Sequence, residues 1–209
     1  MKKTIPLLVL IGAILLRLID SCGKSAPDAE TASDDAGSQA VISAIMTRAS
    51  VRQFTSQPIG ADTLGLLVKA GMAAPTAMNL QPWAFIVVTE QQMLDSLAAV
   101  HPYSNLKTAT AAIIVCGDLE KAADGFGRDF WIQDCSAATE NILLAAHAMG
   151  LGAVWCGVYP NPKVVPGVTR VLSIPERIIP LNIITMGHPA AETEPKHKWN
   201  PQNVHYQKW

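Results

Sequence analysis

Apolar and polar positions alternate along this chain with two periods, and each period predicts its own kind of element. Four nearly continuous apolar runs, at residues 84–90, 110–118, 152–158 and 181–189, have the length and the bounding turn residues of buried strands. Helical spacing predicts helices over residues 40–50, 62–74, 91–100 and 134–150. Strands without a polar side must be covered on both faces. The pattern therefore predicts one sheet with helices on either side, in an α/β or α+β domain.

The stretch 134–150 is rich in alanine and has few polar positions, and Gly150 stands where a helix-ending residue is expected. A helix that is apolar almost all round is buried on several sides. This stretch is therefore expected in a core or at an interface between subunits.

The first 22 residues are set apart as a targeting segment. A basic start is followed by 12 apolar residues, Ile5–Leu16, which is shorter than the roughly 20 residues of a membrane span. The segment ends in small residues before a cysteine, and so resembles a bacterial lipoprotein signal with Cys22 as the lipidated residue. This predicts anchoring by lipid in the cell envelope, facing the periplasm; a plain secretory signal and a short membrane anchor are the alternatives.

Residues 23–39 are small, polar and acidic, without apolar periodicity. Such a stretch buries too little apolar surface to order itself, so it is expected to be a flexible linker. The folded domain is expected to cover residues 40–209.

The net charge of −1 gives no sign of a nucleic-acid binder. The chain has no GxGxxG, GxxxxGK[ST] or GxSxG motif, and its histidines and cysteines lack the spacing of metal ligands. Cys116, Cys135 and Cys156 lie in apolar surroundings and are expected to be buried. No carboxylate pair stands out as acid and base, so a cofactor is expected to carry any chemistry.

Arg48, Ser50 and Arg52 follow the first predicted helix. In an extended chain these alternate residues project to one side, and two guanidinium groups with a hydroxyl suit a phosphate. The alternative is a solvated surface with ordinary ion pairs.

The loop before the first strand contains Asn79 and Gln81, followed by Trp83. Their amides donate and accept, as the edge of a flat heterocycle with imide groups requires. The alternative is a polar connection whose amides bond the local backbone.

Three segments together resemble the FMN-dependent nitroreductase family: "RASVRQF" with "APTAMNLQPWAFIVV", then "DCSAATENILLAAHAMGLGAVWCG", then the basic tail "KHKWNPQNVHYQKW". The resemblance implies an α+β fold of three layers, α/β/α, around a mixed, mainly antiparallel sheet. It also implies an obligate homodimer that exchanges its C-terminal tails and holds FMN at the interface.

The resemblance also implies a role for each matching position. One set would hold the phosphate and ribityl chain of FMN: Arg48, Ala49, Ser50, Arg52, Lys196 and Lys198. A loop from the partner subunit would wrap the cofactor: Pro75, Thr76, Ala77, Met78, Asn79 and Gln81. Backbone groups would approach flavin N5 and O4: Val154, Trp155, Cys156 and Gly157.

The activity that the resemblance implies is a ping-pong transfer of two electrons from NAD(P)H through flavin N5 to a nitroaromatic, a quinone or a similar acceptor. An envelope location conflicts with this, because pyridine nucleotides are cytoplasmic. Three explanations remain open: a cytoplasmic protein whose true start lies downstream near Met46, a different electron donor, or a flavin site kept for a different redox role. The alternative function is that of an envelope-tethered flavin-binding protein without NAD(P)H turnover.

Overall fold

The computed structural model describes residues 29–209, with side chains from residue 36 onward. The chain divides into two compact units, residues 1–42 and 43–209. The predicted signal segment and its Cys22 lie outside the described residues. Within residues 29–209, no helix has both the length and the apolar character that a membrane span requires.

The unit 43–209 is built on a four-stranded sheet of order β1-β2-β4-β3. Its strands are β1 (Trp83–Val88), β2 (Ala111–Asp118), β3 (Gly152–Gly157) and β4 (Ile178–Gly187), and all neighbouring pairs are antiparallel. A parallel bridge from Ser50 to Ala153 adds the segment after α2 (Ala29–Thr47) to the outer edge of β3. The four named strands thus form an antiparallel sheet with one isolated parallel bridge at its edge, where the family resemblance implies a mixed, mainly antiparallel sheet.

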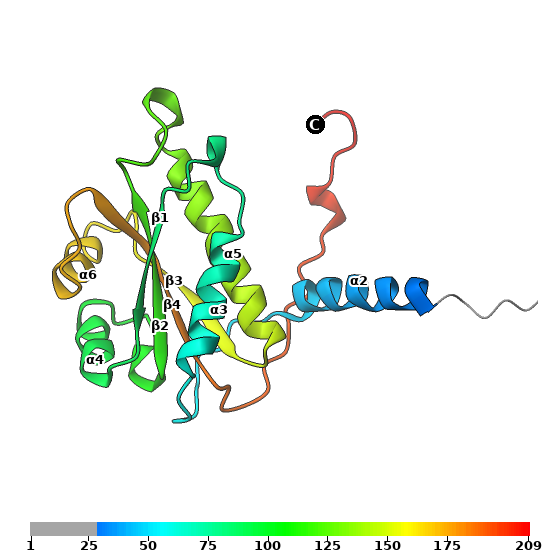
Figure 1. Ribbon diagram of the computed structural model, residues 1–209, viewed down its shortest axis with the longest axis horizontal. Helices are drawn as coiled ribbons and strands as arrows, with labels where there is room; N and C mark the ends of the chain where they lie inside the picture. The colour runs from blue at the N-terminus through cyan, green and yellow to red at the C-terminus, as the bar shows by residue number, and fades with distance from the viewer. Residues whose placement is uncertain (1–28) are drawn as a thin grey trace, which may run out of the picture. The chain divides into compact units, whose positions relative to one another are not determined.

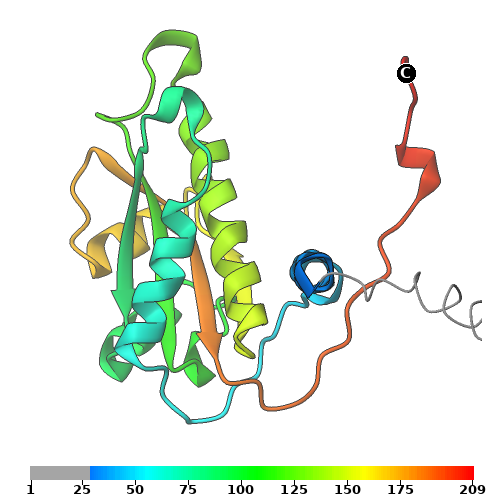
Figure 2. The ribbon, with the colours of Figure 1, turned by 45° about the vertical axis from the view of Figure 1, so that its right-hand side comes forward.

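Helices cover both faces of this sheet (Figures 1 and 2). On one face lie α3 (Ala61–Met72) and α5 (Phe130–Ala148), and on the other lie α4 (Gln91–Val100) and α6 (Val165–Val171). Successive side chains of β2 alternate between the faces: Ile113 joins the core under α3 and α5, and Ile114 the core under α4 and α6. The expected three-layer α+β fold is confirmed.

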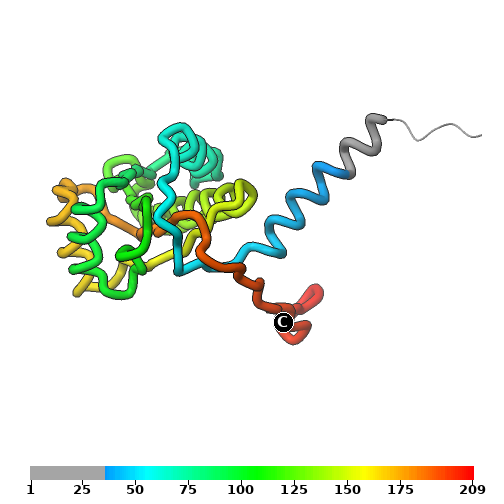
Figure 3. The backbone as a smooth tube through the Cα atoms, turned by 90° about the horizontal axis from the view of Figure 1, so that it is seen from below, coloured from blue at the N-terminus to red at the C-terminus, as the bar shows by residue number. Residues whose placement is uncertain are grey.

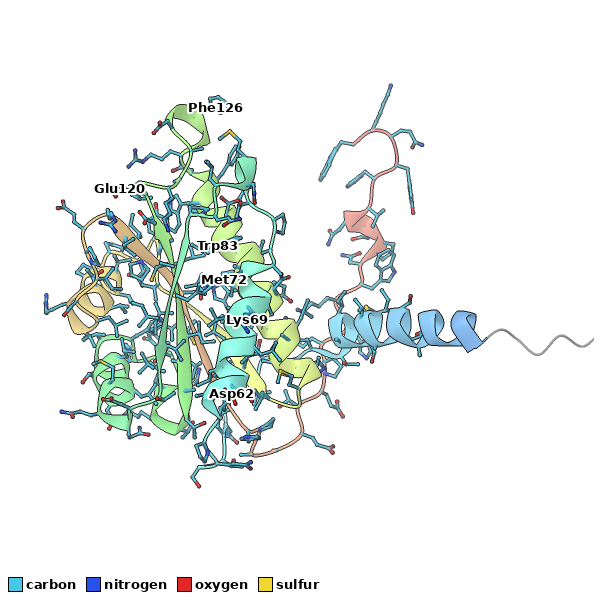
Figure 4. All side chains as sticks on the ribbon, in the orientation of Figure 1. Asp62, Lys69, Met72, Trp83, Glu120 and Phe126 are labelled. Atoms are coloured by element: carbon cyan, nitrogen blue, oxygen red, sulfur yellow. The ribbon has the colours of Figure 1, made fainter. Side chains whose placement is uncertain are left out.

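Several boundaries differ from those predicted. Helix α5 begins at Phe130, four residues before the predicted start, and β4 begins at Ile178 instead of Leu181. Helix α6 was not predicted, because Pro166 and Gly167 lie in its first turn. The loop before α5 carries Phe126 at its tip, where the side chain is 98% exposed (Figure 4).

Helix α2 includes residues 29–39, which the sequence assigns to a flexible linker. Over this described part the chain is helical, and the expected flexibility stays a prediction. The apolar residues expected on one face of this helix are indeed there, but they are exposed: Val41, Ile42, Ile45 and Met46 are 51–69% accessible. Such a patch is typical of a surface that a partner covers.

The segment after α2 crosses the ends of β3 and β4 at contact distance. Gly152 and Gly187 are paired across the two strands. A β-carbon at Gly152 would lie 2.6 Å from Val51 Cγ1, and one at Gly187 would lie 2.8 Å from Phe54 Cβ. The backbone N–H of Thr55 donates to the carbonyl of His188, and that of Ala190 to Gln53. In Figure 3 the two segments run side by side at this crossing.

The three cysteines of the described domain are buried, as the sequence predicts. Burial raises the pKa of the Cys116 thiol to about 12. Burial also raises the pKa of Cys135, whose Sγ donates to the Cys116 carbonyl. At neutral pH these thiols are protonated and act as small apolar side chains.

Two glycines of the same strand should respond differently to alanine. Gly152→Ala is expected to lower the free energy of unfolding by about 1–3 kcal/mol, because the added methyl overpacks against Val51. Gly157→Ala is the matched control: a β-carbon there meets nothing within 4 Å, so stability should change by less than about 0.5 kcal/mol. Denaturant unfolding of both variants, each freed of bound ligand, measures the difference. Equal free energies of unfolding for the two variants would contradict the close contact between Val51 and Gly152.

Candidate functional site

A basic cavity of about 270 Å³ lies where the segment after α2 meets the start of the C-terminal tail. Its lining includes the six residues that the sequence assigns to phosphate binding, namely Arg48, Ala49, Ser50, Arg52, Lys196 and Lys198, together with Thr193 and Glu194. Four cations therefore face one carboxylate. The structure brings together residues that lie more than 140 positions apart in the chain.

The local chain conformation explains how the arginines reach this cavity. Helix α2 ends at Thr47, and the chain then becomes extended along the edge of β3, with the N–H of Val51 donating to the Ala153 carbonyl. Arg48 and Arg52 lie on the same side of this segment, as the alternation predicts. Arg48 Nε pairs with Glu140 Oε1 at 3.1 Å, which leaves its two terminal nitrogens for another acceptor.

A second cavity, of about 500 Å³, lies at the end of β3 and is called here the strand-end cavity. It is lined by Arg52, by four residues of β3, by one side of residues 100–105 and by the turn after β3, namely Val154, Trp155, Cys156, Gly157, Val100, His101, Pro102, Tyr103, Asn105, Asn161, Lys163 and Val164. Arg52 lines both cavities, so they adjoin. The volume is that of a typical small-molecule pocket.

The outer edge of β3 offers unpaired backbone donors to this cavity. In an antiparallel strand, alternate residues point their N–H and C=O groups away from the neighbouring strand. The Ala153 carbonyl points outward, because it accepts from Val51, and Trp155 and Gly157 share this orientation. Within residues 29–209 no backbone acceptor meets their N–H groups. These N–H groups are therefore free to donate to a ligand with acceptor atoms.

Gly157 leaves open space above the strand end. A β-carbon at Gly157 would meet nothing within 4 Å, so neither packing nor a positive φ in this chain requires glycine. The space is free for a flat group to approach the backbone, which is one of the common uses of glycine.

Asn105 belongs to this site, although sequence reasoning did not find it. It has a left-handed φ of 57° and lines the strand-end cavity with Arg52 and Gly157. Burial raises the pKa of the neighbouring Cys156 thiol, and Thr185, Arg52 and Asn105 partly oppose that rise. No sequence motif marks Asn105, but an asparagine directly after a turn is a weak signal of left-handed backbone.

The loop 75–81 is strained and exposed. Met78, Asn79 and Gln81 all have φ between 52° and 55°, and the Met78 side chain is 73% exposed. The Gln81 amide donates to Asn79 Oδ1 at 3.2 Å, so the two amides pair with each other rather than with the local backbone. Strained backbone of this kind is concentrated at functional sites.

Within one chain this loop does not reach the two cavities. The N–H of Ala77 donates to Asp134, in the first turns of α5, while Thr47 meets His147 at the far end of that helix. The two contacts are about 20 Å apart along α5. Figures 1 and 2 show the loop and the start of the tail at opposite ends of the helix. None of the described residues 75–81 lines either cavity.

The two adjoining cavities suit a ligand with an anionic group and a flat heterocycle. The four cations match a phosphate, and the β3 donors with the Asn105 amide match ring atoms that accept and donate. The strand-end cavity has no carboxylate, and the described residues form no cluster of metal-ligating side chains. The side chains present are therefore suited to binding and orienting a ligand.

Comparison with known proteins identifies the family. The nitroreductase family model matches residues 45–105 and 97–188. A Methanothermobacter thermautotrophicus protein, provisionally named NADH dehydrogenase/NAD(P)H nitroreductase, is 44% identical over 81% of this chain and 87% of its own length. A solved structure of the same provisional name from Parabacteroides distasonis is 42% identical, covers 81% of this chain and 98% of its own, and superposes with a TM-score of 0.76.

A third similar structure contains a ligand. A provisionally named nitroreductase from Desulfovibrio desulfuricans, solved in complex with FMN, is 29% identical and covers 81% of this chain and 97% of its own, with a TM-score of 0.70. The fold, the two adjoining cavities and these similarities lead to one conclusion: this chain belongs to the nitroreductase family.

Proposed function

We propose that this protein is an FMN-dependent NAD(P)H oxidoreductase, which passes two electrons in a ping-pong cycle to a nitroaromatic, a quinone or a similar flat acceptor. The observation that carries the proposal is the pair of adjoining cavities that share Arg52. One has the charge for a phosphate, and the other has free backbone donors beside an open glycine. Relatives named as flavin reductases that use NADPH, such as one from Bacillus subtilis, support the same assignment.

The residues present fit FMN at both ends. The phosphate of FMN carries about two negative charges at neutral pH. Arg48, Arg52, Lys196 and Lys198 would offset these charges. The N–H groups of Trp155 and Gly157 would donate to the ring at N5 and O4, and the Asn105 amide would meet the imide edge.

When bound, FMN supplies the redox chemistry, accepting a hydride from NAD(P)H and returning two electrons to the acceptor. The protein holds the phosphate by charge and orients the ring by backbone donors. Donors near N5 and O4 also stabilise negative charge on the reduced ring, and so raise its potential. The open space at Gly157 would let the flat ring lie close to the strand end.

The site is proposed to be completed by a second copy of this chain. The loop 75–81 lies about 20 Å along α5 from the segment that carries the arginines, so the loop of one subunit would serve the site of the other. The exposed apolar residues of α2 and the exposed tail, with Trp199, Tyr206 and Trp209, have the character of an exchanged interface.

The purified protein should be yellow, absorb near 450 nm and lose this absorption when NADH or NADPH is added without oxygen (roughly, for protein-bound flavin). Anaerobic titration with each nucleotide checks cofactor, donor and turnover in one experiment. A flavin that binds but is not reduced would instead support the flavin-binding alternative. A colourless dimer that takes up no added FMN would falsify the proposal.

The two ends of the site should be separable by the choice of ligand. Lys196→Ala removes one phosphate partner and should weaken FMN by about 1.5–3 kcal/mol, the value of a charged hydrogen bond, while leaving riboflavin binding unchanged. Gly157→Ala fills the open space beside the ring. It should weaken the binding of both FMN and riboflavin without lowering the free energy of unfolding of the apoprotein. Fluorescence titration of the apoprotein measures all four affinities. Weaker binding of riboflavin to Lys196→Ala would contradict the assignment of the basic cavity to the phosphate.

The envelope location is proposed from the N-terminal sequence alone, with a cytoplasmic protein from a downstream start as the alternative. If Cys22 is lipidated, the protein of the native host should fractionate with membranes and incorporate labelled palmitate, and Cys22→Ser should abolish both. Membrane association that persists in Cys22→Ser would point to an uncleaved anchor instead.

A further inference from the structure

His101 is a buried histidine in the lining of the strand-end cavity, and its imidazole is not among the groups that would contact the cofactor. It lies directly after α4, and its side chain is 5% exposed. Its Nε2 lies 2.9 Å from the carbonyl oxygen of Gly157. Because that oxygen can only accept, Nε2 carries the proton and donates.

The other ring nitrogen makes no compensating bond. Nδ1 of His101 is fully buried and has no hydrogen-bond partner among the described residues. A buried polar atom without a partner costs free energy, so a buried histidine here needs a specific explanation. The single hydrogen bond of the ring goes to Gly157. What the imidazole contributes beyond its packing is therefore this link to the end of β3.

The same loop is tied to the sheet by a second buried connection. Ser104 Oγ donates to the His101 carbonyl at 2.6 Å. The Ser104 carbonyl in turn accepts from Thr185 Oγ1 on β4 at 2.7 Å and from Cys156 Sγ on β3 at 3.3 Å. Ser104, Thr185 and Cys156 are all buried. The loop 101–105 is thus fastened to both strands next to Asn105.

We infer that His101 is a positioning residue for the flavin ring, an inference that rests on the proposed function. Its bond fixes the outward carbonyl of Gly157, and with it the loop that presents Asn105. The Gly157 N–H and the Asn105 amide come from segments about 50 positions apart, yet both line one cavity. They meet neighbouring ring atoms only if their separation is held, and His101 and Ser104 hold it.

The test compares two substitutions of the histidine. His101→Leu keeps an apolar volume and removes the donor, whereas His101→Gln places an amide nitrogen where Nε2 was. The apoproteins are titrated with FMN and with riboflavin, well below each variant's melting temperature. His101→Leu should weaken both flavins by about three- to tenfold, the value of one hydrogen bond, and shift the visible spectrum of the bound flavin. His101→Gln should bind close to the native affinity.

Each alternative gives a different result. If His101→Leu lowers only the melting temperature and binds both flavins at native affinity, the histidine is a packing residue and the inference is wrong. If His101→Gln binds the flavins as weakly as His101→Leu does, the hydrogen-bond donor at this position does not account for the affinity, and the inference also fails. If His101→Leu does not fold, Thr185→Val decides the matter: it removes the donor to the Ser104 carbonyl, which ties the same loop to β4, and it should also weaken the binding of both flavins, whereas native affinity would overturn the inference. A native chain that binds no flavin would instead refute the proposed function.

Discussion

Two glycines paired across β3 and β4 allow another backbone segment to cross the sheet at contact distance. Val51 packs on Gly152 and Phe54 packs on Gly187, at distances that leave no room for a β-carbon. This crossing holds the segment after α2 against the edge of the sheet, and so fixes where Arg48 and Arg52 project. It also leads the tail after β4 past the same point, which brings Lys196 and Lys198 to the arginines. The basic cavity is therefore a consequence of close backbone packing.

The elements of the fold were largely predictable, because β2 and β4 are buried on both faces and their sequences are continuous apolar runs. Helix α6 was not predicted, because a proline and a glycine in its first turn are typical of a loop. The proline is allowed in the first turn, and Gly167 is required by contact with Val100. The helical conformation of residues 29–39 was also unforeseen, since the stretch has no apolar face that would signal it.

The candidate site was predictable only where one segment carries several of its residues. Arg48, Ser50 and Arg52 share an extended segment, so local spacing was enough to group them. Asn105 and His101 could not be recognised in that way, because their relation to Gly157 exists only after α4, the loop and β3 are packed together. A buried histidine cannot be distinguished from a solvated one by sequence alone. The loop 75–81 was recognisable from its composition, but its strain and its distance from the arginines appear only in three dimensions.

One end of the site is built from charged side chains and the other from backbone N–H groups. This difference separates the affinity for the bound cofactor from its redox potential. The basic cavity uses long side chains, two of them on the exposed tail, so its contribution is mainly charge and affinity. The ring end uses backbone donors at the edge of a buried sheet, fastened by the hydrogen bond of His101 to Gly157 and by that of Thr185 to the Ser104 carbonyl. Electronic tuning of a flavin requires donors that do not move when its charge changes. Affinity can then vary with the cations while the potential follows the rigid strand end.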